Sequence, residues 1–125
     1  MDEYHSHFQS SEFACNCCGE GGISTELWNM LESARVIAGV PFVITSGFRC
    51  INKQAELIEQ GRSSATSSHP RGFAVDISAV DSEKRAKIRK ALILAGFERS
   101  GTQKDFIHID IDPEKNKPRE WLYND

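Results

Sequence analysis

Apolar residues recur at helical spacing in two long segments of the chain. In residues 24–38 the stripe begins after Ser24, whose hydroxyl can cap the free amides of a helix start. The second stripe begins after Asp81 or Ser82, either of which can act as the cap, and Gly96 ends it. The spacing therefore predicts two long amphipathic helices.

Four short segments have the composition or alternation of strands, and a third helix is expected between them. Residues 41–45 are apolar and β-branched, which predicts a buried strand. Residues 72–77 alternate strictly between apolar and polar or small positions, and 97–100 and 105–112 read as a hairpin. Residues 52–60, which stop before a glycine, are expected to form the short helix.

Both ends of the chain lack a strong periodic pattern. The polar residues 1–22 predict an irregular N-terminal arm, and the charged residues 113–125 predict a tail that Trp121 and Tyr123 dock onto the body. A length of 125 residues suits one folded unit, so we expect residues 1–125 to form a single domain.

Composition excludes several classes of protein. Apolar residues make up 39% and charged residues 26%, which is typical of a globular chain. Fifteen basic against 18 acidic side chains give a net charge of -3, which argues against a nucleic-acid partner, so the basic run 84–90 is interpreted as a solvated helix face. Neither a membrane anchor nor a signal peptide is visible, and we expect a monomer.

Four cysteines do not match a common framework. Cys15, Cys17 and Cys18 cluster near the N-terminus, and Cys50 lies alone. Structural zinc sites usually combine two separated cysteine pairs, so this spacing favours buried thiols, or one bridge from the cluster to Cys50, over a zinc site.

Three residues suggest a metal site elsewhere. His69 lies in a loop, Asp76 follows seven residues later on the polar face of a predicted strand, and His108 lies on the polar face of another. Each residue alone is more often structural than a ligand. If the two strands share a sheet, however, two imidazoles and one carboxylate leave a fourth position open, as in hydrolytic zinc sites.

Three motifs in this order resemble the D-alanyl-D-alanine carboxypeptidase family of zinc peptidases. That family includes murein endopeptidases, phage endolysins and vancomycin-resistance dipeptidases, and the Hedgehog signalling domain is a structural relative. The match extends from about Phe8 to Trp121. The motifs are Ser46-Gly47-Phe48-Arg49, Ser67-x-His69-x-x-Gly72-x-Ala74-Val75-Asp76-Ile77 and Phe106-Ile107-His108-Ile109-Asp110.

The resemblance implies a small α+β domain, Hedgehog-like, with a central antiparallel sheet flanked by helices. It implies one zinc ion on His69, Asp76 and His108, and it places Arg49 where the family has an arginine that binds substrate or stabilises charge. Ser67 would bind substrate or orient a ligand. This chain has Asn52-Lys53 and Gln60-Gly61-Arg62 where many relatives have other residues, so the preference of a subgroup does not transfer.

The resemblance also indicates a candidate general base. Asp105 precedes His108 by three residues, where relatives carry an acidic residue, but strand alternation puts it on the opposite face unless the strand starts or bulges there. Asp110, which shares the face of His108, is the alternative, although it could instead orient a ligand.

The function expected from the resemblance is zinc-dependent hydrolysis of peptidoglycan stem or cross-link peptides. Both the D,D-carboxypeptidase or endopeptidase type and the L-alanyl-D-glutamate endolysin type are open. Such an enzyme would act at the cell wall or periplasm, as a bacterial protein or as a phage lysis enzyme made in the cytoplasm. The alternative is a non-catalytic, zinc-stabilised module that binds cell wall or protein.

Overall fold

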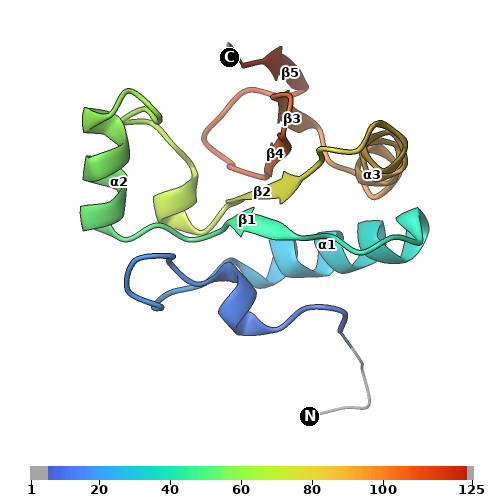
Figure 1. Ribbon diagram of the computed structural model, residues 1–125, viewed down its shortest axis with the longest axis horizontal. Coiled ribbons are helices and arrows are strands. Elements are labelled where there is room, and N and C mark those ends of the chain that lie inside the picture. Colours follow the sequence, from blue (N-terminus) through green and yellow to red (C-terminus); the bar gives the residue numbers. More distant parts are fainter. Residues whose placement is uncertain (1–5, 124–125) are drawn as a thin grey trace.

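A five-stranded sheet lies at the centre of the structure, a computed structural model that describes residues 6–123 (Figure 1). The first five residues of the expected arm and the last two of the expected tail lie outside the described residues. In chain order the elements are η1 (Ser10–Phe13), α1 (Thr25–Ala38), β1 (Ile44–Ser46), α2 (Ile51–Glu59), η2 (His69–Arg71), β2 (Ala74–Ser78), α3 (Ser82–Leu94), β3 (Arg99–Thr102), β4 (Phe106–Asp110) and β5 (Arg119–Leu122).

The strand order is β1-β2-β4-β3-β5, and the fold is α+β. The pairs β1·β2, β2·β4 and β3·β4 are antiparallel, and the expected hairpin is confirmed as β3 and β4. The expected antiparallel sheet is confirmed for these four strands, and at one edge β5 adds a strand parallel to β3. The segment expected to be a docked tail therefore contributes an edge strand.

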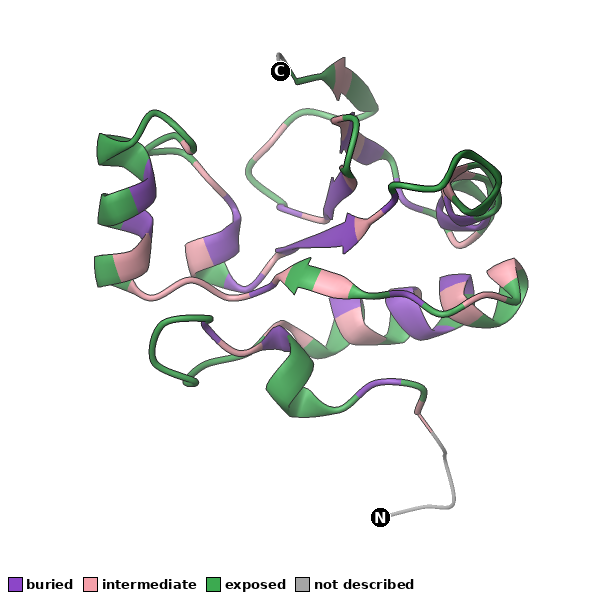
Figure 2. Ribbon diagram, viewed as in Figure 1, coloured by how far each residue is buried: buried purple, intermediate pink, exposed green. Residues whose placement is uncertain are grey.

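Helices α1 and α3 begin at the predicted caps. The hydroxyl of Ser24 accepts a hydrogen bond from the amide of Leu27 at 3.2 Å, and Asp81 caps α3 through the amide of Lys84. The buried sides of both helices join one core with the apolar face of the sheet (Figure 2). No helix within residues 6–123 has the length and apolar character needed to cross a bilayer.

The first strand is shorter and more exposed than expected. The predicted buried strand 41–45 is observed as β1, three residues that start at Ile44 and form an edge of the sheet. Phe42 is buried in the core before the strand begins, whereas Val43 is 61% exposed. The apolar run therefore contains both a loop residue anchored in the core, Phe42, and the start of an edge strand at Ile44. Periodicity alone does not distinguish these two roles.

Aromatic packing fixes the N-terminal arm, which contains the 3-10 helix η1 and is therefore not irregular throughout. Phe8 and Phe13 are buried with ring centroids 5.4 Å apart, and Phe13 packs edge-on against Trp28 of α1 at 4.9 Å. Glu32 of α1, also buried, accepts hydrogen bonds from Ser6 and from the amide and the ring of His7. The arm is thereby held on α1.

Strands β2 and β4 divide their side chains between two faces. Val75 and Ile77 lie in the core with the isoleucines of β4. Asp76, His108 and Asp110 belong to the alternate positions. This second face carries the candidate site, which lies between the sheet, the loop after α2 and the C-terminal segment.

Candidate metal centre and substrate cleft

Three side chains from separate segments meet on the polar face of the sheet. His69 comes from η2, and Asp76 and His108 are register partners on β2 and β4. Asp76 Oδ1 lies 2.9 Å from His108 Nδ1 and 3.3 Å from His69 Nε2. One ligand atom of each residue lies within 4.8 Å of the others, and all three residues are buried.

The far nitrogen of each imidazole has a hydrogen-bond acceptor. His69 Nδ1 donates to the carbonyl oxygen of Gly47 at 2.7 Å, and His108 Nε2 donates to Asp110 Oδ2 at 2.8 Å. These bonds leave His69 Nε2 and His108 Nδ1 as the nitrogens that face Asp76. His69 Nε2 is the one buried side-chain polar atom among the described residues that lacks a hydrogen-bond partner.

The geometry and chemistry of the donors fit zinc. Ligands about 2.0–2.1 Å from a tetrahedral zinc ion lie about 3.3 Å apart, close to the spacings seen around Asp76 Oδ1. Two imidazoles and one carboxylate are a donor set that zinc accepts, with a fourth position left for water or substrate. The buried Nε2 of His69, which has no hydrogen-bond partner, is an electron-pair donor that a cation at this position would engage.

Burial and mutual contacts shift the pKa values of these groups. Burial lowers the pKa of His69 and outweighs the nearby charge of Asp76. Burial opposes ionisation of Asp76, but the adjacent imidazoles hold the pKa of its carboxyl well below the usual range. Burial also works against protonation of His108, yet hydrogen bonds to Asp110 and Asp76 raise its pKa.

A buried polar network holds the loop that carries His69. Ser68 donates to Asp112 Oδ2 at 2.7 Å, and Arg71 forms an ion pair with the same oxygen. Ser67 Oγ accepts a hydrogen bond from the amide of His69 at 3.2 Å. Gly72 then adopts a φ of 77°, a left-handed conformation that lets the 3-10 turn lead directly into β2. His69 is therefore fixed by its neighbours rather than held on a free loop.

Arg49 reaches the same centre from the loop after β1. Its Nη2 lies 3.4 Å from Asp76 Oδ2, and Nε donates to Ser46 Oγ at 3.1 Å. Nη1 donates to Gln54 and to Ser63. Burial lowers the pKa of Arg49 although Asp76 opposes this. These contacts place a guanidinium group beside the three candidate ligands.

A cleft of about 390 Å³ opens above these residues. Its basic lining residues, Arg49, Arg62, Arg99 and Lys115, outnumber the acidic Asp76 and Asp110. The aromatic rings of Phe106, Trp121 and Tyr123 contribute apolar surface, and burial raises the pKa of Tyr123. Such a lining suits an anionic ligand.

The structure brings together most, but not all, of the residues singled out in the sequence. Arg49, Ser67 and Asp110 line the cleft with the three candidate ligands. Asp105 does not line the cleft, and its side chain is exposed just before β4. The regular β2·β4 register contains no bulge that would turn Asp105 toward the face of His108. Both oxygens of Asp110 are already engaged, with His108 and with Arg99.

Several residues of the site were not predicted from the sequence to belong to it. Trp121 and Tyr123 were expected only to dock a tail, yet both line the cleft. Arg99 binds Asp110 at 2.6 Å and lies 5.0 Å from the ring of Trp121, and Asp112 holds the His69 loop. The alternation that indicates Asp110 continues to Asp112, and that continuation was the available clue.

Comparison with known proteins agrees with this geometry. Residues 6–110 match the model of the family described as Peptidase M15. No curated protein matches the chain. Among solved structures, the crystal structure of Serratia marcescens L-Ala D-Glu endopeptidase ChiX is similar, with a TM-score of 0.61 and 24% sequence identity over 73% of this chain and 81% of that one. At this identity the likeness establishes a shared fold.

Proposed function

This chain belongs to the peptidase M15 family, and from that premise we propose that it is a zinc-dependent hydrolase of peptide bonds in peptidoglycan. The observation that carries the proposal is the meeting of His69, Asp76 and His108 at the base of a basic cleft. These three residues would hold one zinc ion. When bound there, zinc would supply Lewis-acid activation of a water molecule and of the scissile carbonyl.

Arg49 would bind and orient the substrate. Its guanidinium group can accept a carboxylate with two hydrogen bonds or stabilise the oxyanion that develops during hydrolysis. Peptidoglycan stem peptides carry several carboxylates, and the cations of the cleft complement them. Ser67, whose hydroxyl accepts the amide of His69, would mainly keep that ligand in place.

Two acidic residues divide the remaining roles. We assign Asp110 to the orientation of His108, because His108 and Arg99 already occupy its oxygens. Asp105 is then the proposed proton acceptor and donor to the leaving amine. Its neighbour Phe106 lines the cleft, but Asp105 itself is exposed outside it, so a substitution must test this role.

The choice of bond is open to direct measurement. ChiX is an L-Ala D-Glu endopeptidase, so the bond between these two residues is the first candidate for this chain. The D-Ala–D-Ala bond and the bond from D-Ala to diaminopimelate are the other two. All three occur in the cell wall, where we propose that the enzyme acts.

Defined muropeptides incubated with zinc-loaded protein, followed by mass spectrometry of the products, test the proposal and identify the bond. We expect cleavage that a chelator abolishes, that zinc restores and that His108→Ala lacks. The absence of cleavage by zinc-loaded protein across the panel would contradict the proposal. Binding of muropeptides without turnover would instead indicate the non-catalytic module.

A further inference from the structure

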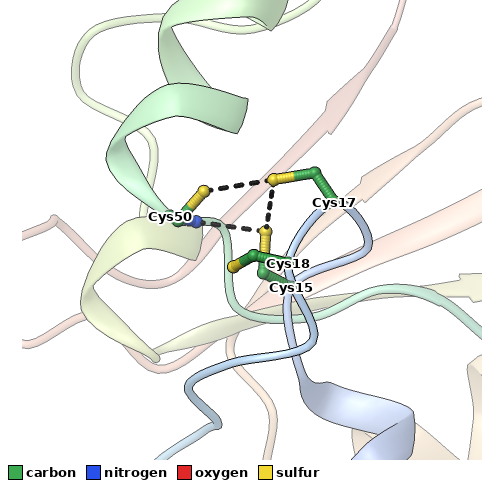
Figure 3. A group of neighbouring side chains, drawn as sticks. All are labelled: Cys15, Cys17, Cys18 and Cys50. Carbon is green, nitrogen blue, oxygen red and sulfur yellow. Dashed lines mark hydrogen bonds between the residues drawn. The ribbon is translucent and has the colours of Figure 1, made fainter.

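The four cysteines form a second cluster (Figure 3), and none of them lines the cleft. Cys15, Cys17 and Cys18 come from the loop after η1, and Cys50 caps α2. The four sulfur atoms lie within 4.8 Å of one another. Cys17 Sγ is 3.5 Å from Cys15 Sγ and 3.3 Å from Cys50 Sγ. All four are free cysteines in this structure, so the expected bridge to Cys50 is not formed here, and the expectation of buried thiols holds for Cys15 alone.

The loop that carries three of these cysteines has little apolar anchoring. Cys15 is buried, but residues 16–22 are exposed. The loop closes on itself, since the amide of Gly19 donates to the carbonyl of Cys15, and the amide of Cys15 donates to the carbonyl of Glu20, both at 2.8 Å. These turns bring the three sulfur atoms of the loop close together. Because residues 16–22 are exposed, burial of apolar surface does not account for the order of this loop.

Backbone amides also point at the sulfur atoms. The amide of Cys50 donates to Cys15 Sγ at 3.4 Å, and the amide of Lys53 donates to Cys50 Sγ at 3.4 Å. Cys50 lies at the N-terminus of α2, where free amides and the helix dipole stabilise negative charge. Donors of this kind suit thiolates, the form of cysteine that binds metal.

We propose that Cys15, Cys17, Cys18 and Cys50 bind a second zinc ion with a structural role. Four sulfur atoms about 2.3 Å from a tetrahedral zinc ion lie about 3.8 Å apart, so a small adjustment of the observed spacings completes the site. Four thiolates form a closed site, typical of structural zinc, whereas the three ligands in the cleft leave a position open. The fold supplies the ligand that the sequence spacing lacks, because Cys50 is brought to the loop.

The position of the cluster indicates which segment of the chain this ion would stabilise. The cysteine loop lies against residues 45–50: the amide of Phe48 donates to the carbonyl of Phe13 at 2.8 Å, and Asn16 donates to the carbonyl of Thr45 at 3.1 Å. The same stretch carries Gly47, the acceptor for His69, and Arg49. A metal ion that joins Cys50 to the loop therefore holds the segment that positions Arg49 beside the cleft.

Cobalt substitution tests the proposal without a need for activity. Protein purified under reducing conditions, stripped of metal and loaded with Co²⁺ is expected to show an intense near-ultraviolet sulfur-to-cobalt charge-transfer band. That band requires thiolate ligands, so His108→Ala should keep it while losing the metal of the cleft. Elemental analysis of zinc-loaded protein should give two zinc ions per chain, and one in His108→Ala.

Substitutions in the cluster complete the test. Cys17→Ser and Cys18→Ser change exposed residues, which limits damage to folding, and each should weaken the charge-transfer band and lower the zinc content to one. Glu20→Gln, in the same loop, retains all four sulfur atoms and is the matched control.

Two results would overturn the inference. One is wild-type protein without the charge-transfer band, and the other is a loss of two hydrogen masses per bridge in non-reducing mass spectrometry, which would show disulfides. Neither result bears on the peptidase proposal, which depends on the ligands in the cleft.

Discussion

Asp110 accepts a hydrogen bond from Nε2 of His108, two residues earlier on β4, at 2.8 Å. The other oxygen of Asp110 accepts from Arg99 Nε at 2.6 Å, so the carboxylate is held in place on both sides. Since Nε2 carries the proton in this bond, Nδ1 of His108 is left to face Asp76. The pair thus selects which nitrogen serves as the candidate ligand.

Asp110→Asn should lower zinc affinity of the cleft by about 10–100-fold, the usual effect of removing the partner of a ligating histidine. Competition with a chromophoric chelator measures this affinity. Asp105→Asn makes the same charge change on the same hairpin and serves as the control, with affinity close to wild type. Equal affinity in Asp110→Asn and wild type would refute the orienting role.

Asp105→Asn tests the proton-transfer role. If Asp105 accepts the proton, kcat should fall by about 10²–10⁴-fold while zinc content and the thermal midpoint stay unchanged. Steady-state kinetics on the best muropeptide substrate give kcat and KM separately. A variant with wild-type kcat would remove Asp105 from the mechanism and direct attention to other groups in the cleft.

Arg49→Lys keeps the charge but removes the planar, two-pronged donor. We expect kcat/KM to fall by about 10²–10³-fold if Arg49 stabilises the oxyanion. Arg62→Lys is the comparison, because Arg62 lines the cleft but hydrogen-bonds to the exposed Gln60, and its effect should be much smaller. Similar losses in the two variants would argue for general electrostatic attraction instead.

Glu32→Gln should destabilise the fold by about 1–3 kcal/mol, since a buried carboxylate that accepts three hydrogen bonds becomes neutral. Urea denaturation gives the free energy of unfolding. Glu26→Gln, exposed in the first turn of α1, is the control and should change it little.

The same carboxylate makes stability depend on pH. Burial opposes ionisation of Glu32, but contacts with His7 and Ser6 lower its pKa in the folded protein below the ordinary 4.5. This contribution is therefore complete above about pH 4.5 and is lost as the pH falls through the folded value. In denaturation measured across this range, Glu32→Gln should lose less stability on acidification than wild type. Equal losses would contradict the assignment.

The long helices were predictable because both caps and stripes are local signals. Ser24 and Asp81 cap α1 and α3 as the sequence indicated, and the buried apolar residues of both helices, among them Leu31 and Ile88, lie on the predicted stripes. Strand β5 was missed because Arg119–Leu122 is charged and pairs only at an edge, so its order depends on β3 rather than on its own composition.

The candidate ligands were predictable for a related reason. Strand alternation fixed the faces of Asp76 and His108, and the register between β2 and β4 then placed them opposite each other. The same alternation argued against Asp105, and the structure leaves it outside the cleft. The cysteine cluster could not be predicted from spacing, because its fourth member arrives through the packing of η1 against the loop before α2.

The edge strand β5 separates the metal centre from the aromatic wall of the cleft along the chain. Every candidate metal ligand lies at or before His108, whereas Trp121 and Tyr123 follow it. These two rings reach the cleft because β5 pairs with β3. A truncation before Arg119 would therefore remove the aromatic wall and leave all three candidate ligands in the chain.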